Sequence, residues 1–149
     1  MLVCFDIDGT LANCQHRIHY VRTKPKNWAA FDAGIPNDTV IPQVAKIFEQ
    51  FVNTDHDVIL ASGRNEKSRA ATEKWLHANN IKHYQKLYMR KADDFRSDVI
   101  VKQEILLNEI VADWGKKPDM VFDDRPGVVQ MWRDNGIFVF DVYQGTEDF

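Results

Sequence analysis

The chain has 149 residues, of which 44% are hydrophobic and 28% charged, enough for one globular domain with a substantial core. Its formal charge of −3 excludes a protein that wraps nucleic acid with a basic surface overall. Cys4 and Cys14 have no metal-binding spacing, so a buried thiol and a loop thiol are expected. No signal-peptide pattern and no membrane-length apolar run is present, which predicts a cytoplasmic protein with one domain over residues 1–149.

Five short apolar runs are predicted to form strands: residues 2–5, 58–61, 87–89, 120–122 and 137–142. Helices are predicted between most of them: after Pro42, over 66–79 with Asn65 as the cap, and from about residue 98. A last helix is predicted over 128–135, opened by Pro126 and ended by Gly136. Residues 13–37 show no periodicity and are predicted to form a long, functional loop.

Strands that are apolar throughout and alternate with helices predict an α/β fold with a parallel sheet covered on both faces. Ligands of such sheets bind beyond the carboxyl ends of the strands. Asp6, Ser62 and Asp123 each follow an apolar run directly. We therefore expect these three side chains at one edge of the sheet.

The stretch FDIDGT places two carboxylates, Asp6 and Asp8, at the end of the first strand. On its own this pattern is equally compatible with a strand end followed by a glycine turn. A divalent cation would relieve the repulsion between the two groups, and oxygen ligands beside a phosphate favour Mg²⁺. With Mg²⁺ present, one Asp could attack phosphorus and the other could move the proton of the leaving alcohol.

The stretch ILASGRNE offers a phosphate site, because a Ser62 hydroxyl, a Gly63 amide and a helix N-terminus can surround an anion. Arg64 can add two hydrogen-bond donors. Taken alone, Ser62 is more simply explained as a turn residue and Arg64 as a solvated charge.

Two further carboxylate motifs lie downstream. Asp98 and Lys102 stand four residues apart at the start of a helix, which also suits a surface ion pair. Asp123 and Asp124 follow an apolar strand, where two adjacent carboxylates are hard to keep ionised without a cation.

With these motifs in order, the chain resembles the haloacid dehalogenase (HAD) superfamily of phosphotransferases over nearly its whole length. The resemblance rests on D-x-D-G-T at 6–10, S-G-R at 62–64, the helix-borne Lys102 and the pair Asp123–Asp124. It implies a HAD-like Rossmannoid sheet between helices, with at most a small flap after the first strand. It also implies roles for individual residues: Asp6 as nucleophile, Asp8 as general acid/base, and Ser62 and Lys102 as phosphoryl ligands.

The resemblance further implies a Mg²⁺ ion held by Asp6, by the backbone carbonyl of Asp8 and by Asp124. Asp123 would support that site, although either carboxylate of the pair could face the metal. Thr10 and Gly63, which belong to the first two motifs, would contact the substrate.

A closer likeness is to the 3′-phosphatase domain of bacteriophage polynucleotide kinase/phosphatases. RSDVIVKQEI, FDDRPGVVQMWRDNGI and the final VYQGTEDF are similar to that branch, as are SGR and the stretch WLH followed by LYMR. Arg17, Arg64 and Asp98 fall where the branch carries functional residues, which implies substrate-binding roles. The sequence contains no G-x-x-x-x-G-K-[ST] loop, so it is expected to correspond to the phosphatase half alone.

Three functions follow from this interpretation. The leading one is a Mg²⁺-dependent phosphomonoesterase for 3′-phosphates of nucleic-acid ends or nucleotides, without an obligate protein partner. The likeness also suggests a phage-encoded protein. The alternative is a 5′-nucleotidase for (deoxy)nucleoside monophosphates. The third is a non-catalytic nucleotide-binding module, against which the intact set of Asp6, Asp8, Lys102 and Asp124 argues. An open site under a small basic and aromatic flap is expected to admit bulky phosphorylated ends.

Overall fold

The centre of the computed structural model, which describes residues 1–145, is a five-stranded parallel sheet. Its strands, in spatial order, are β5 (Lys86–Arg90), β4 (Asp57–Asn65), β1 (Leu2–Phe5), β6 (Met120–Asp123) and β7 (Phe138–Asp141). All four residues of β1 are buried, as expected for a central strand without polar residues. The predicted α/β class with a parallel sheet is confirmed.

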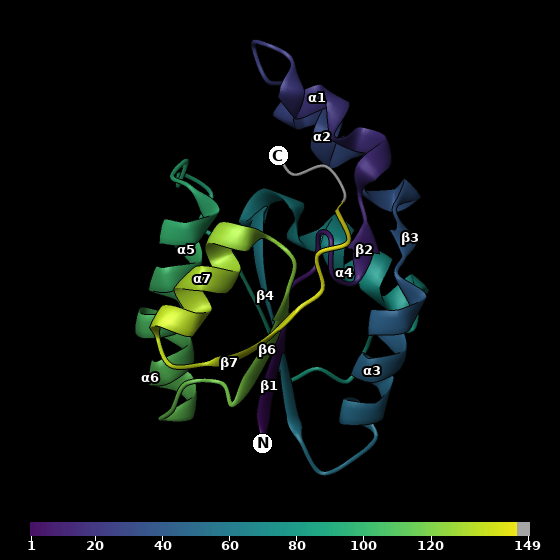
Figure 1. Cartoon of the computed structure of the whole chain (residues 1–149). Helices are drawn as coiled ribbons and strands as arrows, with labels where there is room; N and C mark the ends of the chain where they lie inside the picture. Colours follow the sequence, from purple (N-terminus) through teal and green to yellow (C-terminus); the bar gives the residue numbers. More distant parts are fainter. Residues whose placement is uncertain (146–149) are drawn as a thin grey trace.

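Helices cover both faces of this sheet (Figure 1). On one face lie α3 (Pro42–Val52) and α4 (Arg69–Ala78). On the other lie α5 (Asp98–Glu104), a π-helical turn (Ile105–Ile110), α6 (Val111–Trp114) and α7 (Pro126–Asp134). Trp75 and Trp132 are buried in the two resulting cores, so these tryptophans pack the fold. No helix within residues 1–145 has the length and apolarity needed to cross a membrane.

Strand β4 runs four residues beyond its predicted end at Ala61. Its register against β5 shifts between Ala61 and Asn65, and Asn65 pairs with Arg90. The motif Ser62–Arg64 therefore lies in the irregular end of a strand, not in a turn that leads directly into a helix. The predicted cap is present, because the Asn65 side chain accepts a hydrogen bond from the Lys67 amide. It starts a short 3₁₀ turn, and α4 itself begins only at Arg69.

The prediction of a long loop over residues 13–37 is wrong, because this segment forms a small helical cap. The cap contains two 3₁₀ turns (Gln15–Arg17 and Ile35–Asn37), α1 (His19–Arg22) and α2 (Trp28–Ala33). The short strands β2 (Ala12–Asn13) and β3 (Thr39–Val40) pair at its base. Cys14, Ile18, Val21 and Phe31 form its own small core, so Cys14 is buried and not a loop thiol.

Figure 1 shows α1 and α2 above the carboxyl ends of the sheet strands. A small cap after the first strand was predicted. Its position places it over the carboxyl edge of the sheet, where the candidate site residues lie. Of the C-terminal stretch VYQGTEDF, residues 146–149 lie outside the described residues.

Candidate active site

Side chains from α5, from β6 and from Asp6, the residue directly after β1, meet at the carboxyl edge of the sheet. The Lys102 ammonium donates hydrogen bonds to Asp6 Oδ1 at 2.6 Å and to Asp123 Oδ2 at 2.9 Å. All three side chains are almost fully buried. The Asp6 amide also donates to the carbonyl of Phe122, which ties the end of β1 to β6. Lys102 therefore bonds residues of two strands and not Asp98 four positions away, as a surface pair would.

Asp124 completes what we call the carboxylate cluster: Asp6, Lys102, Asp123 and Asp124. Oxygens of its three carboxylates lie within 4.8 Å of one another. Asp123 is already satisfied within the protein. Its Oδ2 accepts from Lys102 and from the Trp132 indole at 3.0 Å, and its Oδ1 accepts from two backbone amides. Asp6 and Asp124 are the members better placed to offer oxygens to a cation.

Gly9 makes room for this arrangement. Its φ is +84°, a conformation that side chains disfavour, and a Cβ atom there would overlap the carboxylate of Asp124. The glycine of the D-x-D-G-T motif thus allows the loop after β1 to approach the pair after β6. Thr10 adds a hydrogen bond from its hydroxyl to Asp6 Oδ2 at 3.1 Å, which fixes the rotamer of Asp6.

The carboxylate cluster holds more negative than positive charge. Burial raises the pKa of Asp6 well above its ordinary value, and the charge of Asp123 raises it further. Burial, followed by the charge of Asp123, raises the pKa of Asp124 to about 6. The charges of Asp123 and Asp6 raise the pKa of Lys102 despite its burial, so the ammonium stays charged. Hard oxygen donors with excess negative charge fit a divalent cation such as Mg²⁺.

Asp8 lies two residues from Asp6 but belongs to a different group, the arginine cluster: Asp8, Arg17, Asp38 and Arg64. Arg64 donates to Asp8 at 2.6 and 3.0 Å, and Arg17 donates to Asp8 at 3.0 Å. Although burial raises the pKa of Asp8, the neighbouring guanidinium of Arg64 and then that of Arg17 lower it below its ordinary value. The Asp8 side chain is not part of the carboxylate cluster.

Asp38 holds the two arginines from the other side. Its carboxylate accepts from Arg17 at 2.8 Å through both oxygens and from Arg64 at 3.1 Å. It also contacts His16 at 2.7 Å, and its side chain is fully buried. Asp38 was missed from the sequence, because no local pattern relates it to partners 21 and 26 residues away.

The remaining motif residues form a third group beside the cluster. Ser62 is buried, and its hydroxyl accepts from the Arg64 amide at 3.1 Å. A Cβ atom on Gly63 would overlap the carboxylate of Asp98. Asp98 pairs with Arg90 at 2.6 Å and with Arg125 at 2.8 Å.

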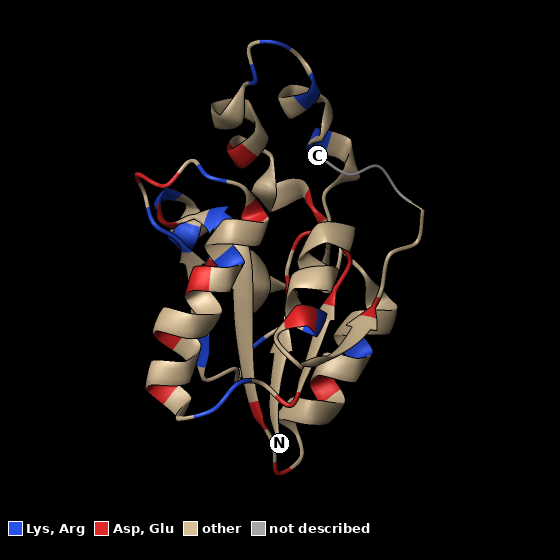
Figure 2. Cartoon of the chain, turned by 60° about the vertical axis from the view of Figure 1, so that its left-hand side comes forward, with Lys and Arg blue, Asp and Glu red and all other residues tan. Residues whose placement is uncertain are grey.

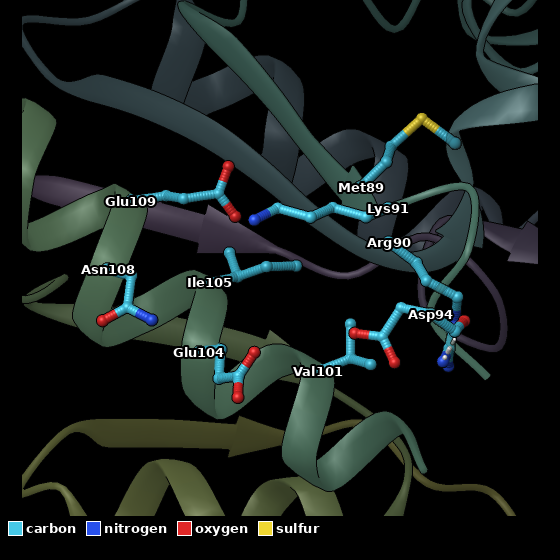
Figure 3. A pocket seen from close by; sticks show the side chains of 9 residues that line it. All are labelled: Met89, Arg90, Lys91, Asp94, Val101, Glu104, Ile105, Asn108 and Glu109. Carbon is cyan, nitrogen blue, oxygen red and sulfur yellow. Dashed lines mark hydrogen bonds between the residues drawn. The ribbon is translucent and has the colours of Figure 1, made fainter. Parts of the chain in front are cut away.

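Arg90 was also missed, although the stretch LYMR that contains it is part of the resemblance. Its side chain donates to the Gly63 carbonyl at 2.8 Å and thereby links Asp98 to the Ser62–Arg64 motif. It also lines a small pocket between the end of β5 and the α5 helix (Figure 3). At about 40 Å³ this pocket has room for a water molecule or two and not for a nucleotide.

Comparisons with known proteins identify the family to which a chain with this site belongs. A family model described as the polynucleotide kinase PNKP phosphatase domain matches residues 1–149. A protein of Autographa californica nuclear polyhedrosis virus, named "Putative bifunctional polynucleotide kinase/RNA ligase", is 33% identical over 99% of this chain. This relative comes from a baculovirus, whereas the sequence suggested a bacteriophage source.

Solved structures of related sequence and fold are also similar to this chain. A chain of the Pnkp1/Rnl/Hen1 complex superimposes with a TM-score of 0.79 and 34% identity over 99% of this chain. A hydrolase from Streptococcus pneumoniae, at 11% identity and a TM-score of 0.63, supports the fold alone. It is matched over 96% of this chain and 92% of its own. By contrast, this chain spans 20% of the viral relative and 47% of the Pnkp1/Rnl/Hen1 chain.

Proposed function

The chain belongs to the family of HAD-type polynucleotide kinase PNKP phosphatase domains, and we propose that it removes 3′-phosphates from polynucleotide ends in a Mg²⁺-dependent reaction. Phosphomonoesterase chemistry is the property of that family. The observation that carries the proposal is the Lys102 ammonium bridging Asp6 and Asp123, with Asp124 alongside. This arrangement keeps Asp6 oriented and supplies positive charge where a phosphoryl group would transfer.

Mg²⁺ would be held by carboxylate oxygens of Asp6 and Asp124 and by the backbone carbonyl of Asp8. When bound, it would offset the negative charge of the carboxylates and of the phosphate. Asp123 would orient the site through Lys102 and not by direct ligation, because its oxygens already have four donors.

In the first step, the Asp6 carboxylate would attack phosphorus, and the bond from phosphorus to the 3′ oxygen would break. The leaving oxygen would take a proton from Asp8. In the second step, Asp8 would accept a proton from water as the water attacks the aspartyl-phosphate, which releases inorganic phosphate and restores Asp6. Ser62 and Lys102 would hold the phosphoryl oxygens during both steps, with Thr10 and Gly63 lining the site.

The arginine cluster bears on the proton transfers. Arg17 and Arg64 favour the ionised form of Asp8, which is the form required for the second step. For the first step Asp8 must carry a proton. The negative charge of the substrate's phosphate would raise the pKa of Asp8 as substrate binds.

A substrate panel tests the function. Phosphate release is measured from a 3′-phosphorylated oligonucleotide, a 3′-mononucleotide, a 5′-mononucleotide and p-nitrophenyl phosphate, each with Mg²⁺ and with EDTA. We expect hydrolysis of the oligonucleotide in Mg²⁺ and none in EDTA. Hydrolysis of the 5′-mononucleotide alone would instead identify a 5′-nucleotidase, an alternative that no relative described above favours. Binding of nucleotides without any hydrolysis would identify a non-catalytic module.

A further inference from the structure

The segment between Asp8 and Asp32 carries no acidic residue, although the whole chain has more acidic than basic residues. It contains four Lys and Arg residues and two histidines, and it forms most of the cap. Figure 2 shows blue segments gathered at the tip of the cap, where Lys24 and Lys26 lie in the connection between α1 and α2. Arg17 is buried against Asp8 and Asp38, so the exposed members of this set are Arg22, Lys24 and Lys26. The tip of the cap thus presents a local positive surface on a negatively charged protein.

Exposed aromatic rings accompany these charges. Trp28 is 50% exposed and Tyr20 36% exposed, so neither ring packs onto the body as a core residue would. Lys26 lies 5.5 Å from the centre of the Trp28 ring. The Tyr20 ring packs against His19, with ring centres 4.0 Å apart. Basic and aromatic side chains in this combination are typical of surfaces that bind single-stranded nucleic acid.

A recess of about 300 Å³ opens in the cap and is lined by His16, Arg17, Tyr20, Ala30, Ala33, Gly34 and Asn37. Its volume is in the range of small-ligand pockets. Arg17 joins this recess to the active site, because the same side chain donates to Asp8 at 3.0 Å. Gly34 leaves room for the Arg17 side chain, since a Cβ atom on Gly34 would lie 3.0 Å from Arg17 Cδ.

We propose that this recess binds a nucleobase of the strand whose 3′-phosphate occupies the active site, a proposal that rests on the proposed function. Tyr20 supplies the face on which the base stacks, and Asn37 supplies an amide that can bond to its edge. Lys24 and Lys26 contact the phosphates that follow along the strand. The cap is accordingly the element that favours polynucleotides over small phosphate esters.

The test is the ratio of kcat/KM for a 3′-phosphorylated single-stranded oligonucleotide to kcat/KM for p-nitrophenyl phosphate. Tyr20→Ala is expected to lower this ratio roughly 5- to 150-fold, the range for loss of one stacked base. Tyr20→Phe, which keeps the ring, is expected to retain the ratio. Phe138→Ala is the matched control, because Phe138 is an exposed aromatic at the amino end of β7.

Two further variants act without removing the tyrosine. Ala33→Leu fills the recess from its wall and is expected to lower the ratio as well. Lys24→Ala with Lys26→Ala is expected to reduce the slope of log KM for the oligonucleotide against log salt by about 0.7 per lysine. The pair Lys116→Ala with Lys117→Ala, on the connection before β6, is its control.

The inference and the proposed function fail differently. If the wild-type protein cleaves the oligonucleotide while Tyr20→Ala and Ala33→Leu keep the wild-type ratio, the recess does not bind a base and the proposed function stands. If the wild-type protein hydrolyses p-nitrophenyl phosphate but not the oligonucleotide, the proposed function is overturned and this inference with it.

Discussion

The carboxylate cluster and the arginine cluster lie at the same edge of the sheet, and their first residues, Asp6 and Asp8, are two positions apart in sequence. They differ in charge balance: positive and negative groups are equal in number in the arginine cluster and unequal in the carboxylate cluster. In the arginine cluster, the two carboxylates of Asp8 and Asp38 face the two guanidinium groups of Arg17 and Arg64. In the carboxylate cluster, three carboxylates gather around the single ammonium group of Lys102.

The difference appears in the pKa values. Those of Asp6 and Asp124 are raised, whereas that of Asp8 is lowered. A balanced buried cluster stabilises a fixed arrangement, whereas an unbalanced one stores repulsion that a bound cation relieves. The first cluster therefore orients groups, and the second has the oxygen donors and the excess negative charge that the proposed Mg²⁺ would use.

The largest effect is expected from Asp6→Asn, which removes the proposed nucleophile while keeping its shape. We expect kcat for the 3′-phosphorylated oligonucleotide to fall by at least about 10⁴-fold, as for other nucleophile deletions. Phosphate release measures the loss, and circular dichroism checks the fold. Asp134→Asn, the same change at an exposed carboxylate, is the control. A variant within tenfold of wild type would exclude Asp6 as the nucleophile.

Breaking the balanced cluster is expected to cost stability. Asp38→Asn leaves two buried guanidinium groups facing one carboxylate, and such a loss typically lowers the free energy of unfolding by about 3–5 kcal/mol. Urea unfolding in EDTA measures the change. Asp32→Asn, also in the cap, is expected to change it little, because burial outweighs the attraction of Arg17 and Arg64 and raises the pKa of Asp32. Equal behaviour of the two variants would mean that Asp38 does not hold the arginines.

Metal binding is expected to stabilise the folded protein, and to do so through the carboxylate cluster alone. Mg²⁺ at 100 times its dissociation constant adds about 2.7 kcal/mol to the free energy of unfolding, and each 1 kcal/mol raises Tm by about 2–4 °C for a chain of this size. We expect Asp124→Asn to weaken or abolish this rise in a thermal melt and Asp134→Asn to retain it. An unchanged response of Asp124→Asn would transfer the role of ligand to Asp123.

The smallest expected effect is the pH dependence of stability in EDTA. Between about pH 4 and pH 6, folded Asp124 keeps a proton that the unfolded chain has released, because its pKa is raised from 3.8 to about 6. Stability should therefore fall by about 2 kcal/mol as pH rises through this window. Asp6, whose pKa is also raised, contributes with the same sign.

Asp8 should act in the opposite direction. Its lowered pKa means that the stability it contributes is complete above pH 4 and is lost as pH falls further. Urea unfolding at intervals from pH 3 to pH 7 separates the two limbs. Asp124→Asn should make the upper limb shallower, leaving the contribution of Asp6, and should leave the lower limb unchanged. The same profile in wild type and variant would contradict the assigned pKa of Asp124.

The contrast also explains which parts of the site could be predicted from sequence. Asp6 and Asp123 follow apolar strands of a parallel sheet, and the geometry of such sheets brings strand ends together whatever the rest of the chain does. The placement of Lys102 beside them depended on the family resemblance, because a helix with Asp98 and Lys102 also suits a surface pair. Asp38 and Arg90 act through contacts with distant residues and carry no local signal.

The cap escaped prediction for a different physical reason. Its helices have three to six residues, so none completes enough turns to show a 3.6-residue period. It is held instead by its four-residue core and by the arginine cluster beneath it. Strand β4 was predicted too short for a related reason. Residues 62–65 contain no apolar run that would indicate a strand, yet the strand continues to Asn65, which pairs with Arg90 of β5.

The bond between Lys102 and Asp6 joins positions 96 residues apart, and Asp123 lies further along the chain than either. β1 is synthesised first, yet its neighbour β6 leaves the ribosome only after most of the domain. Contacts of such long sequence separation carry a large loop-closure entropy cost, and they cannot form before β6 has been synthesised. Phosphate release by this domain would therefore report that a chain has been synthesised through β6 and folded, so the time at which activity appears during synthesis measures when the fold is complete.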